Sequence, residues 1–173
     1  LGEFKKFHDR NKFEWDHSHK AIGEFTKKEN FTILNAFPSS GSSIVNILED
    51  SFWYKSRKFL LDPFGNKGLT TSTITVEVDT LDNLFHNEQD INLLKIDVEG
   101  FSFQVLKGAK EFLLNNSPIL QVEVLSKKLE FDIRESEIVD FLDSIDYKLI
   151  SKKKHYTTHI FSDVICVDYL FEK

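Results

Sequence analysis

Methionine is absent from these 173 residues, and cysteine occurs once. With one cysteine, no disulfide can form within the chain. That residue, Cys166, lies in the apolar run 164–167, where a small packed side chain is a simpler explanation than a nucleophile or a metal ligand. Because the sequence starts with leucine and lacks Met, we expect it to be a fragment of a longer chain.

Long apolar runs are missing as well. No stretch of about 18 apolar residues could cross a membrane, and residues 1–10 alternate apolar with charged side chains, unlike a signal peptide. The net charge is −6, from 22 Lys and Arg against 28 Asp and Glu, which disfavours a nucleic-acid partner. We therefore expect a cytoplasmic protein that binds neither membranes nor nucleic acid.

Glycine and proline are scarce, at 7 and 3 residues, which leaves little material for glycine-rich phosphate loops. We expect a single domain over residues 1–173, with residues 24–73 as an inserted loop and hairpin region. Within it, residues 51–61 mix aromatic with basic side chains, so this segment either binds a partner or packs into the core. His17 and His19 could face the same side of a strand, but no third ligand accompanies them, and we predict no metal site.

The second half of the chain alternates strand and helix patterns. Strands are predicted at 74–79, 92–98, 119–125, 147–151 and 160–169, and helices at 81–85, 101–116 and 135–145. The strand at 92–98 is almost continuously apolar, which is typical of a parallel strand buried on both faces. This order predicts an α/β sheet with helices on its faces and an antiparallel closing pair of strands.

Acidic side chains stand at or near the ends of three predicted strands: Asp79, Asp97 with Glu99, and Glu123. An open parallel sheet binds its ligand at the carboxyl ends of its strands. Buried acids without partners cost several kcal/mol, so packing alone does not explain this concentration of carboxylates. We expect these four residues to share one functional rim.

Several motifs resemble one known family. Residues 94–100 spell L-K-I-D-V-E-G, residues 105–109 spell V-L-K-G-A, and residues 120–124 end in E-V. Together with residues 78–82 (V-D-T-L-D) and 20–23 (K-A-I-G), they resemble the FkbM-like family of S-adenosylmethionine-dependent O-methyltransferases. The resemblance extends from about residue 13 to 169.

This resemblance implies a Rossmann-like class I methyltransferase sheet with S-adenosyl-L-methionine as cofactor, contacted by Ala21, Ile22 and Gly23. It also implies a small-molecule acceptor, a hydroxyl of a sugar or similar polyhydroxylated metabolite. The sequence departs from the class I pattern because it has no first strand followed by a D-x-G-x-x-x-G turn. We expect those first strands upstream of residue 1; the alternative is a relative that has lost cofactor binding.

Residue roles follow from methyl-transfer chemistry, which needs orientation of the acceptor and removal of its proton. We expect Asp97 and Glu99 to be catalytic, although Glu99 could instead cap the helix that follows Gly100. Asp79, Lys95 and Glu123 are candidate substrate-binding residues, with a structural ion pair as the alternative for Lys95.

Other roles in the same segments are structural. Gly100 is expected to form a turn and Gly108 a close contact between helix and sheet, and Asp82 is expected to be an exposed acid at a helix start.

Two other classes of function remain alternatives. One is a non-catalytic methyltransferase-like α/β domain that binds a partner through residues 51–61, and homo-oligomerisation is also left open. The other, a nicotinamide-dependent oxidoreductase, is disfavoured because the G-x-G-x-x-G fingerprint is missing.

Overall fold

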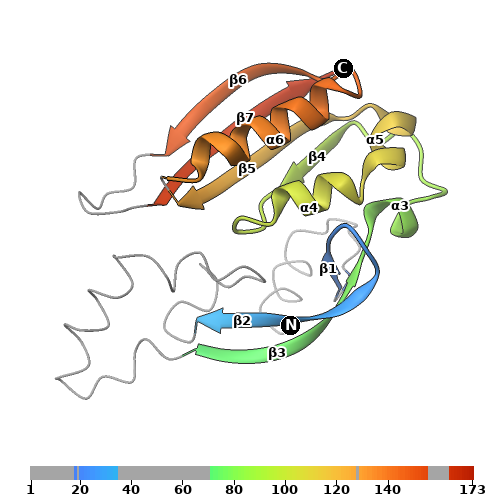
Figure 1. The fold of residues 1–173 in the computed structure, drawn as a ribbon. Helices are drawn as coiled ribbons and strands as arrows, with labels where there is room; N and C mark the ends of the chain where they lie inside the picture. Colours follow the sequence, from blue (N-terminus) through green and yellow to red (C-terminus); the bar gives the residue numbers. More distant parts are fainter. Residues whose placement is uncertain (1–17, 19, 35–70, 128, 156–163) are drawn as a thin grey trace, which may run out of the picture.

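The computed structural model describes residues 18, 20–34, 71–127, 129–155 and 164–173. Within these residues, three strands form one sheet in the order β1-β3-β2 and four form another in the order β4-β5-β7-β6 (Figure 1). Strands and helices mix along the chain, so the expected α/β class is confirmed. Several predicted features lie outside the described residues: His17 and His19, residues 35–70 of the expected inserted region with its segment 51–61, and the start of the strand predicted at 160–169.

The smaller sheet has β3 (Thr71–Asp79) at its centre. Strand β1 (Ala21–Ile22) pairs with it in parallel, and β2 (Lys27–Leu34) pairs with it antiparallel over eight residue pairs. The predicted strand at 74–79 is confirmed, but its expected half-buried pattern holds only at its end. Val78 is 1% exposed whereas Ile74 is 46% exposed, and among the described elements the helices and the larger sheet lie beside the end of β3 that leads into α3 (Figure 1).

The larger sheet joins β4 (Leu93–Ile96), β5 (Ile119–Lys127), β6 (Lys148–His155) and β7 (Val164–Glu172). Strands β4 and β5 are parallel, and β7 runs antiparallel to both of its neighbours, β5 and β6. The predicted antiparallel closing pair is therefore confirmed. The expectation that the strand at 92–98 is buried on both faces is wrong, because β4 covers only four residues and Leu93 is 61% exposed.

Three helices, α4 (Ser102–Lys107), α5 (Lys110–Asn116) and α6 (Phe131–Asp143), lie along the larger sheet in Figure 1. The alternating side chains Leu120, Val122 and Val124 of β5 belong to the same buried core as Leu106 and Leu142 of these helices. Since side chains of a strand alternate between the two faces, Gln121 and Glu123 point to the face opposite that core.

The single helix predicted at 101–116 is wrong, since the chain forms two helices separated at Gly108 and Ala109. The interruption has a steric reason. A Cβ atom on Gly108 would lie 2.0 Å from the carbonyl oxygen of Gly23, so the backbone of the smaller sheet touches the helix end directly. The close helix–sheet contact expected at Gly108 is confirmed.

The remaining helices are short or shifted relative to the sequence patterns. Helix α3 (Leu81–Leu84) is a single turn that follows β3 at once. Helix α6 starts four residues before the predicted 135, and its predicted apolar side is buried at Ile138 and Leu142. No helix in the described part of the chain is long and apolar enough to cross a membrane.

Candidate functional site

The parallel pairing of β4 with β5 brings two predicted site residues to neighbouring positions. Ile96 pairs with Val122, so the next residues, Asp97 and Glu123, stand side by side where β4 ends. Strand β7 adds Asp168 opposite Glu123 in the antiparallel register. We call Asp97, Glu99, Glu123 and Asp168 the acidic cluster.

Glu99 reaches this cluster by a turn. Strand β4 ends at Ile96, and Glu99 and Gly100 adopt positive φ angles of 50° and 92°. Strand geometry therefore does not persist to Glu99, and the turn expected at Gly100 is confirmed. Helix α4 begins only at Ser102, with Phe101 at its N-cap, so Glu99 lies outside the cap position considered for it.

The surroundings of the Glu123 carboxyl change its pKa. Partial burial raises its pKa, and the negative charges of Asp97, Glu99 and Asp168 raise it further. The Cys166 thiol, which donates a hydrogen bond to Oε2 of Glu123 at 3.3 Å, acts in the opposite direction. Burial and the neighbouring Glu123 in turn raise the pKa of the Cys166 thiol well above its usual value, so this cysteine is a poor nucleophile at neutral pH.

Lys95 supplies the positive charge beside the cluster. Its ammonium donates a hydrogen bond to Oδ2 of Asp97 at 2.8 Å, and this bond raises the pKa of Lys95. Asp168 and Glu123 also act on it through their charge. Both members of the Lys95–Asp97 pair are about half exposed, with 54% and 45% of their side chains accessible, so ligands can reach them.

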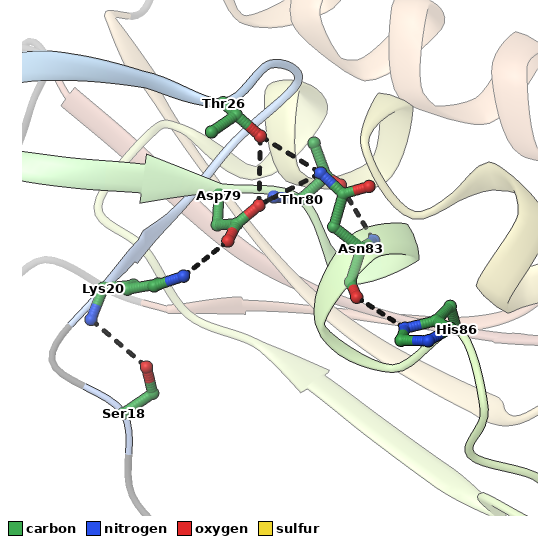
Figure 2. Close-up of polar contacts among 7 residues, drawn as sticks. All are labelled: Ser18, Lys20, Thr26, Asp79, Thr80, Asn83 and His86. Atoms are coloured by element: carbon green, nitrogen blue, oxygen red, sulfur yellow. Dashed lines mark hydrogen bonds and ion pairs between the residues drawn. The ribbon is translucent and has the colours of Figure 1, made fainter.

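Asp79 does not join the acidic cluster, although its strand-end position predicts that it would. It ends β3 in the smaller sheet, only 8% exposed, and protein groups occupy both of its carboxylate oxygens (Figure 2). Oδ2 accepts from Lys20 at 2.7 Å, and Oδ1 accepts from Thr26, from the Thr80 backbone N–H and from Asn83 at 2.9 to 3.1 Å. These donors hold the pKa of Asp79 far below its usual range.

Thr80 and Asp82 have structural roles that account for the T-L-D part of the motif at residues 78–82. The Thr80 side chain caps α3 by accepting from the Asn83 backbone N–H at 3.0 Å. Oδ1 of Asp82 accepts from the Phe112 backbone N–H at 2.8 Å and so caps α5. Asp82 stands in the first turn of α3, as expected, but it is half-buried instead of exposed, because the start of α5 lies against it. The sequence held no signal for this tertiary cap.

The segment predicted to contact the cofactor, Ala21 to Gly23, lies where β1 ends. Ala21 and Ile22 are half-buried, while Gly23 is buried. A Cβ atom on Gly23 would meet Val78 at 2.8 Å and Phe101 at 3.1 Å, so side chains of the protein already fill that space. The structure thus gives Gly23 a packing role, and leaves Ala21 and Ile22 as the partly accessible members of the segment.

The acidic cluster and the group of donors around Asp79 differ in the chemistry that they can perform. The acidic cluster is partly exposed, contains one carboxyl of raised pKa and has an adjacent ammonium, so it can accept or donate a proton and hydrogen-bond a polar ligand. Within the described residues, no three His, Cys, Asp or Glu side chains are arranged to hold a metal ion. Both carboxylate oxygens of Asp79, in contrast, already accept hydrogen bonds from neighbouring protein groups.

Comparison with known proteins gives a consistent result. Residues 10–149 match the profile of the methyltransferase FkbM domain. The crystal structure of the methyltransferase FkbM from Methylobacillus flagellatus KT is similar in fold, with a TM-score of 0.52 and 15% identity, covering 98% of this chain and 32% of that one. This chain thus spans about a third of the length of that protein. No curated protein matches the sequence.

Proposed function

Because this chain belongs to the FkbM methyltransferase domain family, we propose that it forms part of an S-adenosylmethionine-dependent O-methyltransferase. Its proposed acceptor is a hydroxyl group of a sugar or similar polyhydroxylated molecule. The observation that carries this proposal is the partly exposed acidic cluster, which lies where β4 ends beside the middle of β5, with Lys95 next to it.

The proposed reaction needs one proton acceptor. S-adenosylmethionine, when bound, supplies an electrophilic methyl group. The acceptor oxygen must be aligned with the methyl carbon and must lose its proton as the new C–O bond forms. We propose that a carboxylate oxygen of Asp97 accepts this proton. Glu99 is proposed to form a hydrogen bond with the same hydroxyl group.

Lys95 and Glu123 are proposed to bind the acceptor. The Lys95 ammonium, 2.8 Å from Asp97, orients that carboxylate and can donate a further hydrogen bond to a hydroxyl. Glu123 offers carboxylate oxygens that can accept hydrogen bonds from a hydroxyl. Several adjacent donors and acceptors suit a polyhydroxylated ligand better than an apolar one.

The described residues fit one part of the cofactor. Ala21 offers a half-buried apolar side chain in β1, which suits the face of an adenine ring, whereas Ile22 points to the opposite face and packs against the core beside it. Gly23 supports them through its contacts with Val78 and Phe101. The sequence lacks the D-x-G-x-x-x-G turn, so we propose that residues outside this chain bind the rest of the cofactor.

The test uses the natural full-length protein, with calorimetry for S-adenosylhomocysteine and transfer of a labelled methyl group to a panel of sugars. We expect a Kd between about 1 µM and 1 mM, or about −8 to −4 kcal/mol. Asp97→Asn should lower turnover about 10²- to 10⁴-fold, and Glu99→Gln should lower it less.

The fold should survive both substitutions. Asp97 is about half exposed, and such pairs contribute about 0–1 kcal/mol to stability. Asp143→Asn, which removes the exposed partner of Lys148, is the matched control and should keep full turnover. Near-normal turnover of Asp97→Asn with saturating acceptor would mean that the base lies elsewhere. Absence of both cofactor binding and methyl transfer in the wild-type protein would refute the proposed function.

A further inference from the structure

Asp79 spans the segment that we propose to contact the cofactor. Its Oδ2 accepts from Lys20, the residue before Ala21, and its Oδ1 accepts from Thr26, three residues after Gly23. One carboxylate therefore holds the chain on both sides of residues 21–23, as Figure 2 shows for Lys20 and Thr26. We call Lys20, Thr26 and Asp79 the clasp.

The backbone of Asp79 holds the same segment from a third direction. Ile22 pairs with Asp79 in the parallel β1–β3 register, and the Gly23 N–H donates to the Asp79 carbonyl oxygen at 2.9 Å. Strand β1 has only two residues and therefore little ladder of its own. Side-chain bonds at its two ends consequently matter more for its position than they would in a longer strand.

From this geometry we infer that Asp79 is a positioning residue for the cofactor segment and does not bind the acceptor. The inference rests on the proposed function. Asp79 is 8% exposed, and both of its oxygens already have protein donors. An acceptor hydroxyl would have to displace one of these donors, whereas the half-exposed Asp97 needs no such exchange.

Asn83 helps to fix the orientation of the Asp79 carboxylate within the clasp. Its side-chain amide donates both to Oδ1 of Asp79 and to Oγ1 of Thr26, each at 3.1 Å. Three donors on Oδ1 fix the carboxylate plane, which leaves Oδ2 aimed at Lys20. Asp79→Asn can keep an oxygen toward the three donors, but it then presents an NH₂ group to the Lys20 ammonium. The substitution therefore opens the Lys20 side of the clasp at almost unchanged volume.

The experiment compares cofactor and acceptor parameters in the full-length protein. Asp79→Asn should raise the Kd for S-adenosylhomocysteine about 10-fold or more, the scale of one lost hydrogen bond to a charged group. The KM for the acceptor and kcat at saturating cofactor should stay within about 3-fold. Lys20→Met should raise the same Kd, and Asp79→Asn combined with Lys20→Met should cost less than the sum of the two single changes.

A matched control uses another Lys–Asp pair remote from this segment. Lys148 contacts Asp143 at 2.5 Å on the surface, and Lys148→Met should leave the Kd unchanged. An unchanged Kd in Asp79→Asn, or a rise in acceptor KM alone, would overturn the inference. If Asp79→Asn does not fold, Lys20→Met and Thr26→Val, which each remove one side of the clasp, decide the question in the same assay.

Hydrogen exchange gives a readout that does not need the cofactor. Asp79→Asn should speed exchange of the Gly23 amide, while amides in β5 keep their protection. If the wild-type protein binds no cofactor, the proposed function fails, and with it the assignment of a cofactor segment. Exchange then still reports whether the clasp holds residues 21–23, and unchanged exchange at Gly23 would refute the clasp itself.

Discussion

Replacing Gly108 by alanine tests the contact that joins the smaller sheet to the helices. The added Cβ would lie 2.0 Å from the Gly23 carbonyl oxygen, 3.0 Å from the Gly23 carbonyl carbon and 3.2 Å from Cα of Glu24. Because all three atoms belong to the backbone, no side-chain rotation can relieve the overlap. Helix end and sheet must move apart by about 1 Å, since such contacts are normally longer than about 3 Å.

Two effects compete in this substitution. Replacing glycine by alanine at a compatible backbone conformation stabilises by about 0.4–1 kcal/mol, because it restricts the unfolded chain, and the φ of −81° at Gly108 suits alanine. Overpacking costs about 1–3 kcal/mol. The separation also strains the bond from the Asp82 N–H to the Gly108 carbonyl oxygen, at about 0.5–1.5 kcal/mol. The cost of overpacking and of the strained hydrogen bond exceeds the gain from replacing glycine by alanine. We therefore expect a net destabilisation of about 2–3 kcal/mol.

Urea unfolding followed by circular dichroism measures this change. With m between about 1 and 3 kcal/mol/M, the midpoint should fall by about 0.7 to 3 M at constant m. Asn115→Ala is the control, because it raises helix propensity at an exposed position of α5, where we expect a change within about 0.7 kcal/mol. A Gly108→Ala protein as stable as the wild type would refute the close approach and the explanation of the interrupted helix.

Three further substitutions test other parts of the structure. Asp82→Ala removes the cap on the Phe112 N–H and should cost about 0.5–2 kcal/mol in urea unfolding; an unchanged midpoint would refute the cap. Leu142→Ala truncates a fully buried core side chain and should cost about 2–5 kcal/mol, and a loss below 1 kcal/mol would contradict its burial. Glu123 binds its proton more tightly in the folded state, so stability should fall as pH rises from about 4.5 through its raised pKa. Glu123→Gln should remove that decline in stability. If the variant and the wild type had the same dependence of stability on pH, the raised pKa of Glu123 would be refuted.

The sequence patterns predicted the elements better than their contacts. Alternation of apolar side chains located β3 and β5, and the order of elements predicted an α/β fold with an antiparallel closing pair. These are local signals, since each depends on the periodicity of one segment. The burial of β4 was predicted wrongly because burial depends on what packs beside a strand, which its own sequence does not contain.

For the candidate site, too, some predictions from the sequence are correct and others are not. Asp97 and Glu123 were predicted to share a rim at the carboxyl ends of their strands. The register places them side by side, but Glu123 lies in the middle of β5, because this strand continues to Lys127 instead of ending near residue 125. Asp79 also ends a strand, but that strand, β3, belongs to the smaller sheet, whereas β4 and β5 belong to the larger one. A strand-end acid therefore shares a rim with another only when the two strands belong to the same sheet, which sequence alone does not state.

The environments of Asp79 and Glu123 separate structural from chemical acids. Asp79 has donors on both oxygens and a pKa far below its usual range, so it stays ionised and cannot serve as a proton acceptor near neutral pH. Glu123 has a raised pKa and carboxylate neighbours, which is the arrangement expected where protons move. Two acids from the same motif-rich half of the chain, one at the end of β3 and one in the middle of β5, thus have opposite roles, because one carboxylate meets protein donors and the other meets like charges. Partner identity, more than position in the motif, is therefore the property from which the role of each acid follows.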